Sequence, residues 1–235
     1  MKTLALEFST DQRSVAVLDG DVCHGTAVET ATRETHAIAL ITQALASAGL
    51  EREDIELVAV GLGPGSYTGI RSAIALAQGW QLAGGTVPIR LAGCSSVECL
   101  AREAWQKGWW GKVNVVVDAQ RQEVYLAGYE IHAGGVRLTR PLRIAGLVEA
   151  QQLAEAGEIM VGPEIERWFP AGRTLCPTAA TLGGLAARAG HFVAGEELIP
   201  LYLRETSFVK APPLRELPAE LRAPVELETS PNKPL

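Results

Sequence analysis

Three short apolar strands followed by alternating helices and strands occur twice along this chain. The first copy is expected over residues 3–8, 14–18, 22–28, 35–48, 56–62, 68–83, 87–91 and 95–105, in the order strand, strand, strand, helix, strand, helix, strand, helix. The second has strands over 113–118, 123–131 and 136–144, a helix over 147–156, a strand over 158–162 and a helix over 182–192. Asp19-Gly20 and Gly134-Gly135 are typical hairpin turns, because glycine accepts a positive φ. The pattern predicts a duplicated α/β fold with a cleft between its halves.

The expected halves span residues 1–108 and 109–210. A chain of 235 residues is long enough for two small related cores. Beyond residue 210 the composition changes, with six prolines among glutamates and arginines and no aromatic residue. Such a segment buries too little apolar surface to offset the entropy lost on ordering. We therefore expect residues 211–235 to be a disordered, proline-rich tail.

The composition is that of an ordinary globular protein, with 47% apolar and 20% charged residues. A net charge of −6 argues against a free-standing nucleic-acid binder, because such proteins gain affinity by neutralising phosphates. No signal peptide and no apolar run of about 18 residues is visible, so no membrane association is expected. The four cysteines form no C-x-x-C pair. Together these features indicate a cytoplasmic protein.

A glycine-rich turn at residues 61–69 is the most distinctive stretch of the sequence. It lies between a strand and a helix, where backbone N–H groups and the helix dipole can receive an anion. Gly63, Gly65 and Ser66 are the candidate anion-loop residues. However, no lysine follows the glycines, and the spacing fits neither phosphate-binding fingerprint. The residues alone favour a turn that lets the next helix pack closely on the sheet.

Two carboxylates end corresponding strands in the two halves. Glu7 and Asp118 each lie at the end of an apolar strand, where we expect them to face the cleft, and an acid at such a position can hold a magnesium–phosphate unit. Asp118 is not followed by a glycine that would let a phosphate approach the backbone. The alternative is that Asp118 caps a turn or pairs with Arg121.

No catalytic or metal-binding constellation is visible. A helical metal pair requires a second histidine four residues on, and Leu40 occupies that position after His36. The other histidines are scattered, and no G-x-S-x-G elbow occurs. We expect no metal, no cofactor and no catalytic residue in this chain.

The first two helices carry apolar residues nearly all the way round. A surface helix has one apolar face, so both faces of these helices are expected to be covered. The covering element is either another layer of this chain or a second subunit. The residues expected at such a subunit contact are Leu40, Ala44, Ile70, Ile74, Ala77 and Gln78.

Three motifs in one order resemble those of the TsaB (YeaZ) family. Residues 63–71 are similar to its G-P-G-S-[FY]-T-G-[IL]-R signature. Residues 118–125 resemble its D-A-R-R-x-E-V-Y segment, with Gln120 in place of an arginine. Residues 200–204 resemble its P-x-Y-L-R segment. The resemblance covers residues 1–204, and the first motif is highly specific.

This resemblance implies a duplicated actin/hexokinase-like (ribonuclease H-like) fold and a non-catalytic role. The family member supports the catalytic paralogue TsaD, joined by the ATPase TsaE, in transferring threonylcarbamoyl to the tRNA adenosine beside the anticodon. In the family the first two helices pair in homodimers and with TsaD, which favours the subunit contact above. The resemblance and the net charge together predict that tRNA is contacted only indirectly.

Two departures from the family patterns bear on this interpretation. The usual strand-end Asp-Thr-Ser is Glu7-Phe8-Ser9 here, and a bulky Phe8 at the cleft would oppose nucleotide binding. TsaD-type enzymes carry an H-x-x-x-H pair where this chain has His36 and Leu40. The main alternative is a small-molecule kinase or ATPase of the actin/hexokinase superfamily. A second alternative is a glycoprotease, the activity once assigned to relatives of this family. The sequence shows neither a metal-binding histidine pair nor a nucleophile constellation for that chemistry.

Overall fold

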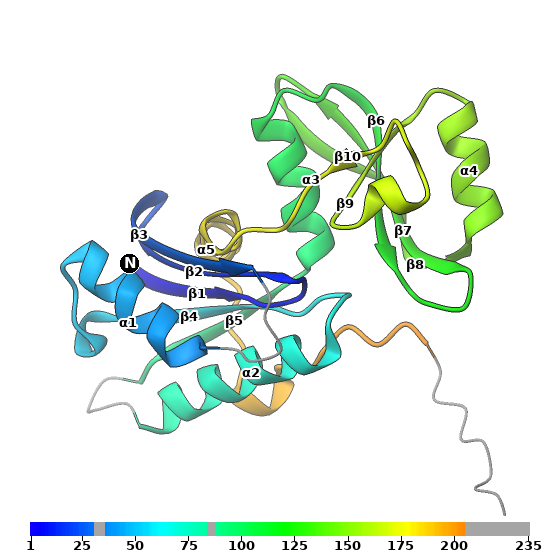
Figure 1. Ribbon diagram of the computed structural model, residues 1–235. Helices are drawn as coiled ribbons and strands as arrows, with labels where there is room; N and C mark the ends of the chain where they lie inside the picture. Colours follow the sequence, from blue (N-terminus) through cyan, green and yellow to red (C-terminus); the bar gives the residue numbers. More distant parts are fainter. Residues whose placement is uncertain (31–35, 84–87, 205–235) are drawn as a thin grey trace, which may run out of the picture. The chain divides into compact units, whose positions relative to one another are not determined.

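Two five-stranded sheets, each with its own helices, organise the chain (Figure 1). The computed structural model describes residues 1–30, 36–83 and 88–204. The first sheet has the order β3-β2-β1-β4-β5. Its strands are β1 (Lys2–Glu7), β2 (Gln12–Asp19), β3 (Val22–Thr30), β4 (Leu57–Gly61) and β5 (Arg90–Cys94). β1 pairs antiparallel with β2 and parallel with β4, as the sequence pattern predicts.

The second sheet repeats this arrangement, with the order β10-β9-β6-β7-β8. Its strands are β6 (Gly111–Asp118), β7 (Glu123–His132), β8 (Gly135–Gly146), β9 (Ile159–Gly162) and β10 (Arg173–Thr174). β6 pairs antiparallel with β7 and parallel with β9, which is the pairing of β1 in the first sheet. The predicted duplicated α/β fold is therefore confirmed.

Alternating side chains on β1 supply the cores of the two layers around the first sheet. Leu4 and Leu6 are buried with the helices α1 (Ala37–Ala48) and α2 (Tyr67–Leu82). Ala5 points to the other face, where it packs in a cluster with α5 (Ala179–Ala189). Both faces of the sheet are covered at its centre, which is why β1 and β4 are almost continuously buried, whereas the edge strand β3 alternates between buried and exposed residues.

The same alternation organises the second sheet. Val113 and Val115 on β6 are buried with α3 (Ser96–Gln106). Val116 lies on the opposite face in a cluster with α4 (Leu147–Glu155) and Ile165. Three short 3₁₀ segments complete the described chain, at Arg52–Asp54, Ile165–Arg167 and Gly195–Glu197.

The helices are not distributed between the sheets in chain order. α3 follows the first sheet in sequence, yet its Leu100 and Ala104 belong to the core of the second. Conversely, Leu182 of α5 lies in a core of the first sheet. The helices meet where Thr178 and Thr181 donate hydrogen bonds to the buried carboxylate of Glu103. The division of the chain near residue 108 stays a prediction, and the exchange of these two helices ties the two sheets together.

The second copy of the pattern was the harder one to predict. The helix expected over 182–192 is α5, Ala179–Ala189, so its predicted bounds were wrong. Thr178 caps its start by accepting a hydrogen bond from the Thr181 N–H, and Gly190 ends it at φ 60°. The two-residue strand β10 was not foreseen. The predicted tail over 211–235 lies outside the described residues. No helix within the described ranges is long and apolar enough to cross a membrane.

Candidate functional site

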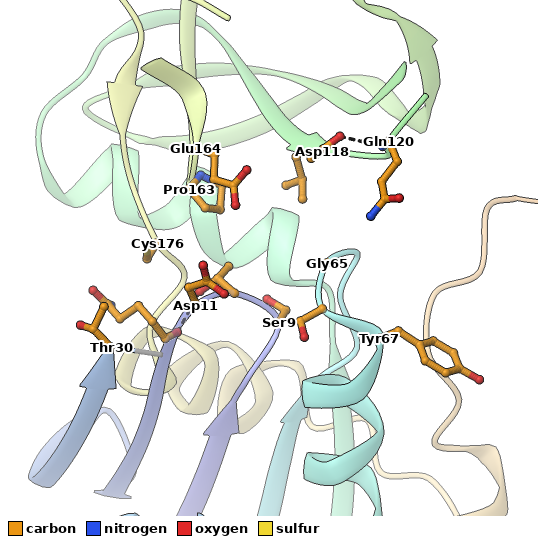
Figure 2. A pocket seen from close by; sticks show the side chains of 14 residues that line it. Ser9, Asp11, Thr30, Gly65, Tyr67, Asp118, Gln120, Pro163, Glu164 and Cys176 are labelled. Carbon is orange, nitrogen blue, oxygen red and sulfur yellow. Dashed lines mark hydrogen bonds between the residues drawn. The ribbon is translucent and has the colours of Figure 1, made fainter. Parts of the chain in front are cut away.

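A cavity of about 550 Å³ lies where the carboxyl ends of β1 and β6 approach each other (Figure 2). Ser9 and Asp11 after β1 line one wall, and Asp118, Gln120 and Glu164 line the other. The remaining lining residues are Thr10, Gln12, Thr30, Gly65, Ser66, Tyr67, Val117, Pro163 and Cys176. Two of the candidate anion-loop residues, together with Asp118, are therefore brought to one cavity.

The glycine-rich turn is shaped by close contact with the end of β1. A side chain at Gly65, which has φ +150°, would place its Cβ 2.1 Å from the Ser9 carbonyl oxygen. A Cβ at Gly69 would lie 2.0 Å from the Phe8 carbonyl oxygen. Backbone cannot yield at such distances, so only glycine fits at either position. This agrees with the interpretation as a tight packing turn.

The N–H groups of this turn are already partly used within the chain. Gly63 donates to Ser96 Oγ at 3.2 Å, and Ser66 donates to the Ser9 carbonyl at 2.7 Å. Gly69 donates to the Ser66 hydroxyl at 3.3 Å, which makes Ser66 the N-cap of α2. An anion at the turn would have to compete with these bonds. Anion binding at this turn stays a prediction, and three of the N–H groups that would bind the anion already donate hydrogen bonds within the chain.

Glu7 is fully buried beneath the turn and does not line the cavity. Its carboxylate accepts hydrogen bonds from the Ser9 N–H and from Ser96 Oγ, each at 2.8 Å. Burial raises the pKa of Glu7, and the hydrogen bonds from Ser9 and Ser96 oppose that rise. The prediction that Glu7 faces the cleft is wrong. Its role is to fix the strand end against the turn.

Phe8 was expected to obstruct the cleft, and that prediction is also wrong. Its ring is fully buried in the core beneath α1 and α2. Side chains alternate along a strand, so Phe8 shares the face of Leu4 and Leu6 rather than opening onto the cavity. Nothing about nucleotide binding follows from its size.

The cavity walls are acidic. Asp11 faces Asp118 and Glu164 across the opening (Figure 2), and none of the described lining residues is a lysine or arginine. Asp118 caps its own turn, because its Oδ1 accepts a hydrogen bond from the Gln120 N–H at 2.6 Å. Its other oxygen lies 3.3 Å from Arg167, not at Arg121 as one alternative held. Without a bridging cation, the cavity therefore repels phosphate groups more than it attracts them.

The turn after Asp118 has an unusual backbone. Gln120, Arg121 and Gln122 have φ values of 61°, 57° and 64°, in the left-handed region that disfavours residues with a Cβ. Three such residues in succession store strain of about 1–2 kcal/mol each. The turn persists because the surrounding structure holds it.

Arg204 supplies part of that support. Its guanidinium donates to the Ala119 carbonyl at 2.9 Å and to the Glu123 carboxylate at 2.7 Å. No role for Arg204 was predicted from the sequence, although it ends the third family motif. Two of the three motifs therefore meet at one turn.

The first and third motifs also touch. The Tyr67 and Tyr202 rings lie 5.9 Å apart between centroids, and the Arg71 guanidinium lies 5.1 Å from the Tyr67 ring. Leu201 N–H donates to the Leu62 carbonyl at 2.9 Å, which fixes the segment against the end of β4. Both tyrosines and Arg71 are exposed, so this contact lies at the surface beside the cavity.

The expected subunit-contact residues on α1 and α2 are mostly not at the surface. Five of the six are buried in the core of the first sheet, namely Leu40, Ala44, Ile70, Ile74 and Ala77. Gln78 is half-buried and donates to the Gly195 carbonyl at 2.7 Å. The assignment of this stripe to a partner is wrong, because the sheet of the same chain already covers it. The sequence of a helix with apolar residues on all sides does not reveal which face points inward.

The exposed faces of the same helices carry small and apolar residues. On α1 they include Ile38, which is 64% exposed, and Ala46. On α2 they include Ala75, Gly79 and Leu82, the last being 88% exposed. Among the described residues, no atom outside the backbone of the same helix and the two chain neighbours lies within 4 Å of a Cβ placed on Gly79. This outer face is therefore available for close helix packing.

No group of three metal-ligating side chains occurs within residues 1–30, 36–83 and 88–204. His36 lies 3.4 Å from Glu29 and is exposed, far from the geometry of a helical metal pair. Burial raises the pKa of Cys94 to about 12, which keeps this thiol protonated and unreactive.

Two sheets with the same strand pairing, a cleft at corresponding strand ends and exchanged helices define a protein with a duplicated α/β fold. The chain is similar to the solved structure of YeaZ from Pseudomonas aeruginosa, with a TM-score of 0.70 and 25% identity over 86% of this chain and 99% of that one. It is 30% identical to the tRNA threonylcarbamoyladenosine biosynthesis protein TsaB of Escherichia coli (strain K12), over 92% of this chain and 100% of that protein.

Two further matches agree. Residues 29–187 match the family described as TsaD, tRNA N6-adenosine threonylcarbamoyltransferase. TsaB of Haemophilus influenzae is 32% identical over 125 residues, which cover 53% of this chain and 52% of that protein. The chain belongs to the TsaB (YeaZ) family, whose named relatives are tRNA threonylcarbamoyladenosine biosynthesis proteins.

Proposed function

We propose that this chain is a non-catalytic subunit that binds and supports the threonylcarbamoyltransferase TsaD in tRNA modification. Membership of the TsaB family supports the pathway. The ATPase TsaE is the proposed third component, and the chain alone is proposed to form a homodimer through the surface it offers to TsaD. The proposed location of the chain is the cytoplasm. Its partners are proposed to supply most of the affinity for tRNA.

The acidic cavity is the observation that carries the non-catalytic assignment. An ATP-dependent enzyme of this fold needs donors or a metal at the strand ends to hold phosphate. Here Asp11, Asp118 and Glu164 line the opening, and Ser66 and Gly69 use their N–H groups within the chain. Among the described residues these carboxylates form no group of three that could hold a bridging metal ion, so charge and hydrogen bonding both disfavour a bound polyphosphate.

The outer face of α1 and α2 is the proposed surface for TsaD. Its exposed leucine and isoleucine side chains bury apolar area, while Ala75 and Gly79 allow backbones to approach closely. A homodimer through the same patch would be isologous, so the second copy and TsaD should compete for it.

The test is TsaD pull-down and sizing chromatography with Ala75→Arg. Position 75 is exposed, so the variant should fold, yet a long charged side chain at a close helix crossing should weaken binding by about tenfold or more. Gln152→Arg on α4 is the matched control, an exposed helical position on the second sheet. Normal TsaD binding by Ala75→Arg would place the interface elsewhere.

The alternative is a small-molecule kinase or ATPase, and the cleft at corresponding strand ends is the observation that favours it. Titration of the isolated chain with Mg-ATP, with an ATPase assay beside it, separates the two proposals. Binding and turnover that are lost on Asp118→Asn would support the enzyme. Neither signal is expected for the scaffold.

A further inference from the structure

Cationic and aromatic side chains gather where α3 ends and β10 passes. The Lys107 ammonium lies 5.9 Å from the Trp109 ring centroid, and the Arg173 guanidinium lies 5.0 Å from the same ring. The neighbouring Trp110 is 51% exposed, with a large aromatic surface facing solvent. We refer to Lys107, Trp109, Trp110 and Arg173 as the Trp109 cluster.

Trp109, at the centre of the cluster, is fixed by a backbone hydrogen bond and by packing. Trp109 N–H donates to the Ala104 carbonyl at 3.1 Å, and the Trp109 ring packs against the core of the second sheet. Gly108 has a φ of 68°, which lets the chain turn sharply between Lys107 and Trp109. Rings fixed in this way lose little entropy when a ligand stacks on them.

The two cations are electrostatically available. Within the described ranges neither Lys107 nor Arg173 has a carboxylate within 4.0 Å, and both lie over Trp109 instead. By contrast, Lys112 and Arg140 nearby share the carboxylate of Glu158, at 3.7 and 2.9 Å. Two cations without a nearby carboxylate, beside an aromatic surface, suit a phosphodiester ligand better than cations that are already paired with a carboxylate.

A hollow adjoins the cluster and shares Arg173 with it. Its volume is about 650 Å³, within the range of small-molecule pockets. Its walls combine apolar surface from Met160, Trp168 and Phe169 with the polar side chain of Gln151 and the carboxylates of Glu155 and Glu158. The Glu158 carboxylate is paired with Lys112 and Arg140, so the Glu155 charge is the one that opposes a phosphodiester here. A planar heterocycle could stack on the apolar wall while Gln151 offers both a hydrogen-bond donor and an acceptor.

We propose that the Trp109 cluster and this hollow bind single-stranded RNA. Lys107 and Arg173 contact backbone phosphates, Trp110 stacks on a base, and the hollow receives an unstacked base. Stacking on aromatic side chains and charge along the backbone are the two parts of single-strand recognition. The choice of RNA rests on the proposed role in tRNA modification. This contact departs from the expectation that tRNA is met only indirectly, and the net charge of −6 keeps it weak.

The experiment is fluorescence anisotropy of the full-length chain with a labelled single-stranded RNA of about 12 nucleotides, a length near known site sizes. The same RNA annealed to its complement serves as the competitor. Arg173→Glu and Lys107→Glu should each weaken binding, and each should reduce the slope of log K against log salt by about 0.7. Trp110→Ala should weaken binding about fivefold or more, through lost stacking.

Arg90→Glu is the matched control. Arg90 also lies over one aromatic ring, with its guanidinium 5.0 Å from Phe192, but in the part of the chain built on the first sheet. The variant changes the net charge equally, so it should leave the affinity and the salt slope close to those of the wild type. Thermal melting of every variant identifies any loss of fold.

Equal weakening by Arg90→Glu and Arg173→Glu would overturn the proposal, because it would indicate only a general effect of net charge. Absence of binding by the wild-type chain, or equal competition by duplex RNA, would also overturn it. TsaD pull-down with Arg173→Glu separates this proposal from the proposed function. If TsaD binding is normal but the cluster binds no RNA, the RNA proposal fails and the proposed function is unaffected. Loss of TsaD binding by Ala75→Arg supports the proposed TsaD interface and does not bear on RNA binding.

Discussion

The Arg204 guanidinium lies 2.7 Å from the Glu123 carboxylate, which joins two residues 81 positions apart. The same guanidinium nitrogen reaches the Ala119 carbonyl, so Arg204 spans the base of the left-handed turn at 120–122. Three residues earlier, the Leu201 N–H donates a hydrogen bond to the carbonyl of Leu62, the residue that follows β4. The segment thus connects the strand ends of both sheets on one side of the cavity.

Arg204→Ala should open this turn locally without unfolding the protein. The ion pair is more than one-third exposed, so its net contribution to stability is at most about 1 kcal/mol. The strained turn loses its external support, and hydrogen exchange of amides 119–123 should become faster. Arg188→Ala, which removes an exposed ion pair to Asp21, is the control. Unchanged exchange in the turn would show that Arg204 does not hold it.

Two glycines of α2 should respond oppositely to alanine. Gly69→Ala places a Cβ almost on the Phe8 carbonyl oxygen, at 2.0 Å, and should lower the free energy of unfolding by about 1–3 kcal/mol. Gly79→Ala meets no described atom within 4 Å outside its own helix and should raise the free energy of unfolding by about 0.5–1 kcal/mol through helix propensity. Urea denaturation of both variants measures the difference. Destabilisation by Gly79→Ala would contradict the open outer face.

Arginine at two nearby positions of α2 should separate the inner from the outer face. Ala77 is fully buried, so Ala77→Arg should cost several kcal/mol by burying an unpaired charge and should lower the melting temperature sharply. Ala75 is exposed, and Ala75→Arg should stay within about 0.5 kcal/mol of the wild type. Similar melting temperatures for the two variants would mean that the helix is rotated from its described orientation.

Glu7→Gln should change how stability depends on pH. Burial raises the pKa of Glu7 above its ordinary value of 4.5, so the folded state binds more protons than the unfolded state between the two values. Wild-type stability contributed by this group therefore falls as pH rises from 4.5 through the folded-state pKa. The substituted amide does not titrate and still accepts a hydrogen bond from the Ser9 N–H. The stability of the variant should therefore rise relative to that of the wild type as pH increases across that window.

Urea denaturation at several pH values above and below 4.5 provides the measurement. Glu53→Gln is the control, because Glu53 is exposed. A variant that loses stability relative to wild type as pH rises would reverse the sign and would indicate that the hydrogen bonds from Ser9 and Ser96 outweigh burial.

Local sequence signals were enough to predict the repeated strand pattern. Asp19-Gly20 and Gly134-Gly135 lie at the hairpins β2–β3 and β7–β8, because glycine conformational freedom acts within a few residues. The apolar runs at 3–8 and 113–118 became β1 and β6, each paired with neighbours on both sides. The glycine-rich turn and its packing role were also predicted correctly, since the limit on side-chain volume there is local.

Long-range packing decided the rest. Leu40 and Ala77 fit equally well as inner or outer residues, and only the position of the sheet placed them in the core. Leu100 and Leu182 each pack on the sheet of the other copy, which no local pattern encodes. The Arg204–Glu123 pair and the Arg173–Trp109 contact join segments distant in sequence, so they exist only once the chain has folded. The periodicity of apolar residues determines that a helix is buried. The free energy of packing the whole chain determines which element covers it.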